Sequence, residues 1–229
     1  TDIQIINAEL ALSDLDILEK NYQKLRKVQK TDDDKRKVQI IERAINLISN
    51  EKKLIGNLEN DDIDYLNTYQ LISIKPVVYI CNVDEGSALS GNEFTKRIED
   101  YAKDNDAEVL LISAKIESEI SQIADEKDKQ DFLESMGLSE TGLKRVIRKG
   151  YEILNYINYF TAGEKELRAW TIIKGTLAPS AAGAIHSDME KGFIRAETIS
   201  YEDYISNNGE SGAKEKGKLR LEGKEYEVK

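Results

Sequence analysis

The segment Lys75-Pro-Val-Val-Tyr-Ile-Cys-Asn-Val-Asp-Glu85 decides the fold of this chain, because an apolar run ends in a polar motif. Residues 77–81 are rich in β-branched and aromatic side chains, which is typical of a parallel strand buried on both faces. Asn82 and Glu85 follow the run. Ligands of open α/β sheets bind beyond the carboxyl ends of the strands, and an amide plus a carboxylate can read a purine edge. The segment therefore predicts a binding loop.

A second apolar run, Val109–Ser113, predicts a neighbouring strand that ends in Ser-Ala-Lys. The amphipathic stretch 93–105 lies between the two runs, so the order is strand, helix, strand, a right-handed crossover unit. The two polar endings resemble the base-binding loops of P-loop NTPases. In the alternative interpretation, Asn82 and Asp84 only turn the chain after the strand. The residues that we expect to bind a nucleotide base are Asn82, Val83, Glu85, Ser113, Ala114 and Lys115.

The spacing Asn-x-x-Glu resembles the guanine-reading motif Asn-Lys-x-Asp of GTPases, with two changes. Glu85 is one methylene longer than Asp, and Val83 stands where GTPases have a Lys whose stem packs on the base. Guanine selectivity requires a carboxylate that accepts from N1–H and from the exocyclic amine, and adenine lacks both donors at that position. The displaced carboxylate and the lost Lys favour ATP over GTP.

The composition indicates a soluble, helix-rich protein of 229 residues, 40% of them hydrophobic and 33% charged. No apolar run is long enough to cross a bilayer and no signal-peptide pattern occurs, so we expect a cytoplasmic protein without a membrane partner. The net charge of -10 argues against binding DNA or other nucleic acid through bulk charge. With one cysteine, Cys81, and one histidine, His186, we expect no metal site and no catalytic residue.

Two regions predict helices that could contact a partner. Apolar residues recur at spacings of three and four over residues 3–30 and again over Val38–Ile48, which predicts a helical hairpin that turns at Thr31–Asp34. The hairpin is either a packing scaffold or a lever that touches a large partner. Residues 117–134 predict a charged helix, and Ser139–Leu154 predicts another. That last helix carries a cluster of cations, which is either a solvated face or an RNA or ribosome contact: Lys144, Arg145, Arg148 and Lys149.

The carboxyl-terminal region reads as a separate small module of strands around one helix. Strands are expected at 156–160, 168–173 and 193–199, and a helix between Pro179 and Gly192. His186 lies inside that predicted helix, where a structural or surface role is more common than catalysis.

Several motifs in this module resemble the carboxyl-terminal TGS domain of the YchF family of Obg-related P-loop ATPases. The motifs are Ala162–Trp170, Lys174–Thr176, Ala178-Pro179, Gly183, Ile185–Asp188 and Lys191–Glu197. Ser113-Ala-Lys-Ile-Glu117 and Ile6–Leu15 also resemble that family. The resemblance implies an α/β fold with an α+β module: a helical hairpin (coiled-coil) arm over residues 1–70, the later part of a P-loop NTPase sheet over 71–155, and a ubiquitin-like β-grasp TGS domain over 156–229.

The resemblance also implies a ribosome-associated NTPase that binds and hydrolyses ATP with magnesium and acts in translation or its regulation, with the ribosome or ribosomal RNA as partner. No G-x-x-x-x-G-K-[ST] motif occurs in the sequence, so we expect this chain alone to hydrolyse no ATP and to bind no nucleotide tightly. Two other functions stay open. One is a nucleotide-independent RNA- or ribosome-binding module, and the other is a GTP-binding protein, against which Val83 and Glu85 argue.

Overall fold

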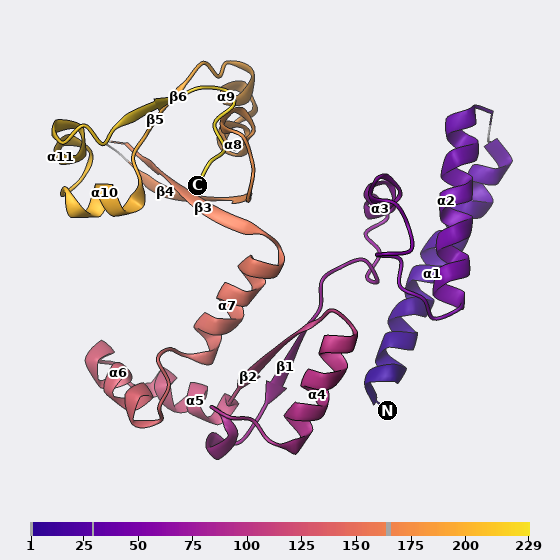
Figure 1. Cartoon of the computed structure of the whole chain (residues 1–229), viewed down its shortest axis with the longest axis horizontal. Coiled ribbons are helices and arrows are strands. Elements are labelled where there is room, and N and C mark those ends of the chain that lie inside the picture. Colours follow the sequence, from indigo (N-terminus) through magenta and orange to yellow (C-terminus); the bar gives the residue numbers. More distant parts are fainter. Residues whose placement is uncertain (1, 29, 164–165) are drawn as a thin grey trace. The chain divides into compact units, whose positions relative to one another are not determined.

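A computed structural model of the chain describes residues 2–28, 30–163 and 166–229, so Gln29 of the predicted hairpin and Glu164 and Lys165 of the predicted module lie outside the described residues. The chain divides into two compact units, residues 1–77 and 78–229 (Figure 1). In its described residues, the first unit is built from helices and the second mixes helices with strands. The expected mixed α and β composition is confirmed.

The first unit contains the predicted helical hairpin. Helix α1 spans Asp2–Val28, α2 spans Asp32–Ser49 and a short α3 spans Asn60–Asn67. The α2 start follows local rules, because the Thr31 hydroxyl accepts from the Asp34 N–H at 3.1 Å and the Asp34 carboxylate accepts from the Thr31 N–H at 3.0 Å. A hydrogen bond from the Lys30 N–H, together with these two bonds to Thr31, lowers the pKa of Asp34 to about 2.

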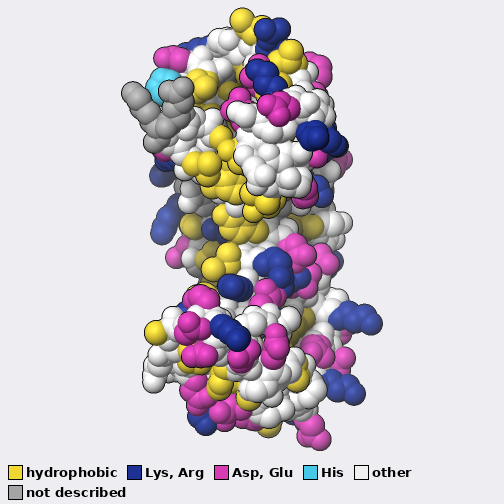
Figure 2. Space-filling view, turned by 90° about the vertical axis from the view of Figure 1, so that its left-hand side faces the viewer, with side chains coloured by type: hydrophobic (Ala, Val, Ile, Leu, Met, Phe, Trp, Pro, Cys, Tyr) yellow, Lys and Arg dark blue, Asp and Glu magenta, His cyan; other side chains and the backbone are white. Residues whose placement is uncertain are grey.

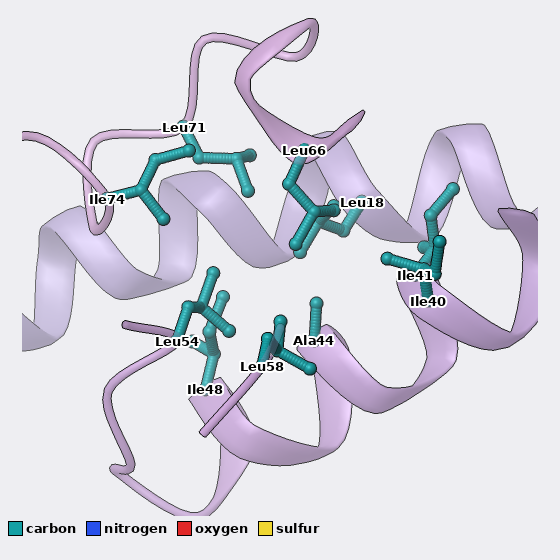
Figure 3. Packing of buried hydrophobic residues seen from close by; sticks show 10 residues of the cluster. All are labelled: Leu18, Ile40, Ile41, Ala44, Ile48, Leu54, Leu58, Leu66, Leu71 and Ile74. Carbon is teal, nitrogen blue, oxygen red and sulfur yellow. The ribbon is translucent and has the colours of Figure 1, made fainter. Parts of the chain in front are cut away.

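The core of this unit gathers the apolar faces of the three helices and the segments that follow them (Figure 3). Leu18 of α1, Ile41 of α2 and Leu66 of α3 are fully buried. The predicted seam is confirmed at Leu18 and Ile41, whereas Ala8 near the start of α1 is exposed. The buried cluster comprises Leu18, Ile40, Ile41, Ala44, Ile48, Leu54, Leu58, Leu66, Leu71 and Ile74.

A buried carboxylate fastens the end of this unit to its first helix. Asp14 of α1 is fully buried, and its two oxygens accept from the N–H groups of Ile72 at 2.9 Å and Ser73 at 2.7 Å. A carboxylate that accepts backbone N–H groups makes a strong, charge-assisted bond. Leu71 and Ile74, on either side of these two residues, are buried in the core. Asp14 therefore holds residues 71–74 against α1.

The second unit begins with the predicted strand, helix and strand. Strand β1 (Val78–Asn82) pairs in parallel with β2 (Glu108–Ile112), from Val78 opposite Glu108 to Asn82 opposite Ile112. Helix α4 (Glu93–Asp104) connects them after a 3-10 turn, η1 (Glu85–Ser87). Tyr79 of β1 meets Tyr101 of α4 edge to face, with ring centroids 6.0 Å apart.

The expected burial of β1 on both faces is wrong for the described residues. Ile80 is 49% exposed, although it lies in the middle of the strand. Side chains alternate along a strand, so Ile80 points away from the face on which Tyr79 contacts α4. Within the described residues this sheet contains two strands, and Ile80 is left open on the other face.

The helices after β2 are shorter than predicted. The expected helix over residues 117–134 is two helices, α5 (Ala114–Gln122) and α6 (Glu126–Ser135). The break occurs because the Asp125 side chain caps α6, accepting from the N–H groups of Lys127 and Asp128 at 2.8 and 3.1 Å. Helix α7 (Gly142–Ile153) begins after the cap Thr141 and not at Ser139.

Glu117 of α5 connects that helix to α7. Its carboxylate accepts from the N–H groups of Gly142 at 2.6 Å and Leu143 at 3.2 Å, at the positive end of the α7 dipole. A Cβ atom at position 142 would lie 2.9 Å from a Glu117 oxygen and 3.0 Å from a methyl group of Ile112. The absence of a side chain at Gly142 therefore allows this close approach.

The carboxyl-terminal part contains two antiparallel strand pairs and four short helices. The elements are β3 (Tyr156–Ala162), β4 (Leu167–Ile173), α8 (Ala178–Ile185), α9 (Ser187–Lys191), β5 (Ala196–Thr198), α10 (Tyr201–Ser206), α11 (Glu210–Glu215) and β6 (Arg220–Glu222). Strand β3 pairs with β4, and β5 pairs with β6. On β4, the Trp170 ring lies 4.1 Å from the Arg168 guanidinium, and its N–H donates to the Thr161 hydroxyl at 3.0 Å.

The predicted helix between Pro179 and Gly192 is also interrupted. His186 separates α8 from α9, and its Nδ1 accepts from the Asp188 N–H at 3.2 Å. The expectation that His186 lies inside a helix is therefore wrong, because its imidazole caps the second helix. The expected strand 193–199 is also shorter and spans Ala196–Thr198.

Replacing the buried anchor of the first unit tests its contribution to stability. We expect Asp14→Ala to lower the free energy of unfolding by about 3 kcal/mol, because two backbone N–H groups lose the buried carboxylate that accepts from them. Urea unfolding followed by circular dichroism measures the change. Asp16→Ala, at an exposed position of the same helix, is the matched control and should change stability little. Equal midpoints for the two variants would contradict the anchor role.

A second variant tests the contact between α5 and α7. We expect Glu117→Gln to lower the free energy of unfolding by about 1–2 kcal/mol, because the amide keeps only one acceptor oxygen and no charge. Hydrogen exchange at the Gly142 and Leu143 amides should accelerate. Asp131→Asn on α6 serves as the charge-matched control. Unchanged exchange at those two amides would show that the carboxylate does not hold α7.

Candidate functional site

The two predicted base loops lie at the same edge of the β1–β2 pair. The strands are parallel, so the polar residues that follow them meet at one end. The side-chain oxygen of Asn82 accepts from the Ala114 N–H at 3.0 Å, and the Val83 N–H donates to the Ile112 carbonyl at 2.8 Å. Asn82 therefore joins the loops across the sheet edge.

An ion pair also links the loops. The ammonium group of Lys115 lies 2.8 Å from a carboxylate oxygen of Glu85. This hydrogen bond, with the charge of Glu85, raises the pKa of Lys115, so the ammonium group stays protonated at neutral pH. Both residues were predicted at the site from the sequence. That they bind each other was not predicted, because the pairing depends on strand register.

Ser113 and Val83 complete the set of predicted base-binding residues. Ser113 is 3% exposed and precedes α5, but its hydroxyl does not cap that helix and has no hydrogen-bond partner among the described protein atoms. A buried hydroxyl without a partner is energetically costly. Val83 is partly buried and adds no polar group. The site therefore holds one buried hydroxyl that is available for a further hydrogen bond.

Of Asn82 and Asp84, which could both have served only to turn the chain, Asp84 alone has that role. The Asp84 carboxylate accepts from the Ser87 N–H at 2.9 Å and caps the η1 turn. Asn82 instead contacts the other loop. Nearby, burial raises the pKa of the Cys81 thiol, which keeps it protonated and unreactive.

The site offers donors and acceptors suited to a purine. An amide, a carboxylate, an ammonium group and a hydroxyl gather at one sheet edge, which fits recognition of a heterocyclic base. The described residues include no group of three or more His, Cys, Asp or Glu side chains that could hold a metal ion.

The predicted cation cluster on α7 is partly paired within the chain. Arg148 makes two hydrogen bonds with the Glu140 carboxylate, and Lys149 contacts Glu152 at 2.7 Å and Glu108 at 3.5 Å. Figure 2 shows cationic and acidic side chains interspersed on the face that it presents. The sequence reading missed these acidic partners, because two of them, Glu108 and Glu140, lie outside α7.

The described helices are all too short or too polar to cross a bilayer.

Comparisons with known proteins agree over the chain. The family model of the YchF GTPase carboxyl-terminal domain, described as a protein of unknown function, matches residues 156–229. Proteins named ribosome-binding ATPase YchF are similar over 99% of the chain in Haemophilus ducreyi, with 46% identity, and in Bacillus subtilis, with 44% identity. The solved Schizosaccharomyces pombe YchF GTPase structure matches 100% of the chain with a TM-score of 0.85 and 31% identity.

The chain spans 63% of the length of these curated relatives and 63% of the solved chain. Sequence and structure comparisons therefore identify the same family over nearly every residue. The chain is therefore similar to proteins of the YchF family over nearly all of its length.

Proposed function

We propose that this chain contributes the base-binding loops, the helical arm and a contact module to a ribosome-binding NTPase that binds and hydrolyses ATP. The observation that carries the proposal is the pair of loops joined by Asn82 and Ala114 at the carboxyl end of two parallel strands. Relatives named ribosome-binding ATPase support the ribosome and ATP parts of it. A protein that acts in translation or its regulation would work in the cytoplasm.

The proposed division of labour follows three segments. The predicted segments are an arm over residues 1–70, a P-loop NTPase sheet over 71–155 and a ubiquitin-like β-grasp TGS domain over 156–229. Leu71 and Ile74 pack in the core of the first unit, so the arm extends beyond residue 70 in this proposal. The parallel β1–β2 pair with its crossover helix supports the second assignment. The match of the carboxyl-terminal family model to residues 156–229 and the two antiparallel strand pairs support the third.

ATP with magnesium supplies the phosphoryl group that is transferred to water. In our proposal the residues of this chain bind and orient the base: Asn82, Val83 and Glu85 on one loop, and Ser113, Ala114 and Lys115 on the other. The solved relative is named a GTPase and the curated relatives are named ATPases, so the choice of base has to be tested. We propose ATP, because Val83 provides no stem for stacking and Glu85 is displaced by one methylene relative to Asp.

A second proposal concerns contact with the ribosome or its RNA. Lys144, Arg145, Arg148 and Lys149 lie on α7, which leads directly into β3 of the carboxyl-terminal module. Arg148 and Lys149 form ion pairs with Glu140 and Glu152 of the same chain. Lys144 is exposed. In a chain of net charge -10, attraction to phosphates requires a local cluster of cations such as this one.

The base assignment can be tested by restoring the GTPase motif. We expect the double variant Val83→Lys with Glu85→Asp in the full-length protein to shift the ratio of GTP to ATP affinity by about tenfold toward GTP. The shorter carboxylate and the Lys stem rebuild the guanine-reading geometry. Titrations with ATP and with GTP measure the ratio. Glu215→Asp, at an exposed position of α11, is the control for a shortened carboxylate elsewhere. A double variant that is folded and keeps the original ratio would refute the base assignment.

The ribosome contact can be tested by charge reversal. We expect Arg145→Glu with Arg148→Glu to weaken ribosome pelleting and to reduce the slope of log affinity against log salt by about 0.7–0.9 for each phosphate that the variant no longer neutralises. Nucleotide affinity should not change. Arg97→Glu with Lys103→Glu on α4 is the matched control. If the reversal lowers the melting temperature and leaves pelleting of the folded protein unchanged, the cations are structural, as the Arg148–Glu140 pair would suggest.

Ribosome pelleting with this chain alone separates the main proposal from a nucleotide-independent binding module. If this chain pellets with ribosomes equally well with and without nucleotide, the nucleotide-independent binding module is favoured.

A further inference from the structure

The ion pair between the two base loops has a consequence for base selection. Lys115 is the second residue of α5 and Glu85 begins the η1 turn, and their charged atoms lie 2.8 Å apart. The Lys115 side chain is 66% exposed and that of Glu85 is 37% exposed, so both can be reached from solvent. Lys115 lies two residues after Ser113, whose buried hydroxyl is unpaired among the described atoms. The pair therefore sits within the proposed base site.

Guanine and adenine make different demands on a carboxylate. Guanine presents two donors, N1–H and the exocyclic amine, and a carboxylate that reads both uses both of its oxygens. Adenine lacks both donors at that position and presents the acceptor nitrogen N1 there, so it requires no carboxylate oxygen. An ammonium group already bound to the carboxylate competes with guanine for an oxygen. It can remain in place beside adenine.

We propose that Lys115 is a specificity-determining residue, which occupies one oxygen of Glu85 and thereby lowers affinity for GTP relative to ATP. This inference rests on the proposed base site and adds a role that the lengths of side chains at positions 83 and 85 do not explain. The loops do not depend on the ion pair to stay together, because the Asn82 oxygen and the Ala114 N–H also join them. Lys115 can therefore be replaced without separating the loops.

The expected effect is modest, since both groups of the pair are partly exposed. Exposed ion pairs contribute little, so release of Glu85 should favour GTP relative to ATP by about three- to fivefold. The expected shift in relative affinity toward GTP has the same direction whether or not Lys115 also donates to the acceptor nitrogen of adenine. Loss of such a bond would weaken ATP binding and move the ratio the same way.

The test compares ATP and GTP titrations of the full-length protein with those of Lys115→Met. We expect the ratio of the GTP dissociation constant to the ATP dissociation constant to fall about three- to fivefold. Lys103→Met, an exposed lysine on α4, is the matched control and should leave the ratio unchanged. Lys115→Arg retains a cation that can pair with Glu85 and can engage both of its oxygens, so the ratio should not fall.

A third variant identifies the cause. In Lys115→Met combined with Glu85→Gln, the carboxylate is also absent, so the gain for GTP should disappear. An unchanged ratio in folded Lys115→Met, or a gain that persists without the carboxylate, overturns the inference. The ratio of the GTP to the ATP dissociation constant in the unaltered protein tests the ATP proposal. The change in this ratio on replacing Lys115 tests the role of Lys115 separately. A full-length protein that binds neither nucleotide overturns both.

Discussion

The hydrogen bond between the Asn82 side chain and the Ala114 backbone is the contact on which the arrangement of the second unit depends. The parallel ladder of β1 and β2 ends where the Val83 N–H reaches the Ile112 carbonyl. Among the described residues, the pairing of these two strands goes no further, and the Asn82 amide continues the connection by binding the first residue of α5. The Asn82 side chain takes the place of a backbone acceptor for the Ala114 N–H, and this bond holds the two polar strand ends together.

The same connection reaches the carboxyl-terminal module through helix contacts. Three residues after Ala114, Glu117 binds the first N–H groups of α7, and α7 continues into β3. At the other end of α7, the Tyr151 ring meets Tyr156 of β3 at a centroid distance of 6.1 Å. The predicted base loops and the module are therefore linked through α5 and α7 by charge-assisted bonds and a ring contact.

Periodicity was sufficient to predict the elements whose formation depends on neighbouring residues. The hairpin, the strand, helix and strand unit, and the first two strands of the module follow from spacings of apolar side chains along the sequence. The loops that carry Asn82 and Lys115 were predicted as one site because parallel strands end at the same edge. The base-binding roles of these residues remain predictions.

What the sequence could not provide depends on contacts between distant residues. In the sequence, Asp14 is one of several charged residues of a helix. Its role depends on hydrogen bonds from residues 72 and 73, which are distant along the chain. The acidic partners Glu140 and Glu108 lie outside α7, so two of the four cations in a cluster that looks uncompensated in sequence are paired in space. The helix breaks at Asp125 and His186 were missed for a different reason. Both residues cap a following helix with their side chains, a signal that the broad apolar pattern conceals.

The position of Trp170 gives the chain a built-in optical label. It is the one tryptophan in the sequence, so light that excites indole selectively will report on β4 alone. Its ring lies against the Arg168 guanidinium and its N–H is bound to Thr161, two contacts that affect indole emission. Any event that separates β3 from β4 will break the bond to Thr161 and alter the emission spectrum, while the tyrosines of the helical arm remain silent at that wavelength.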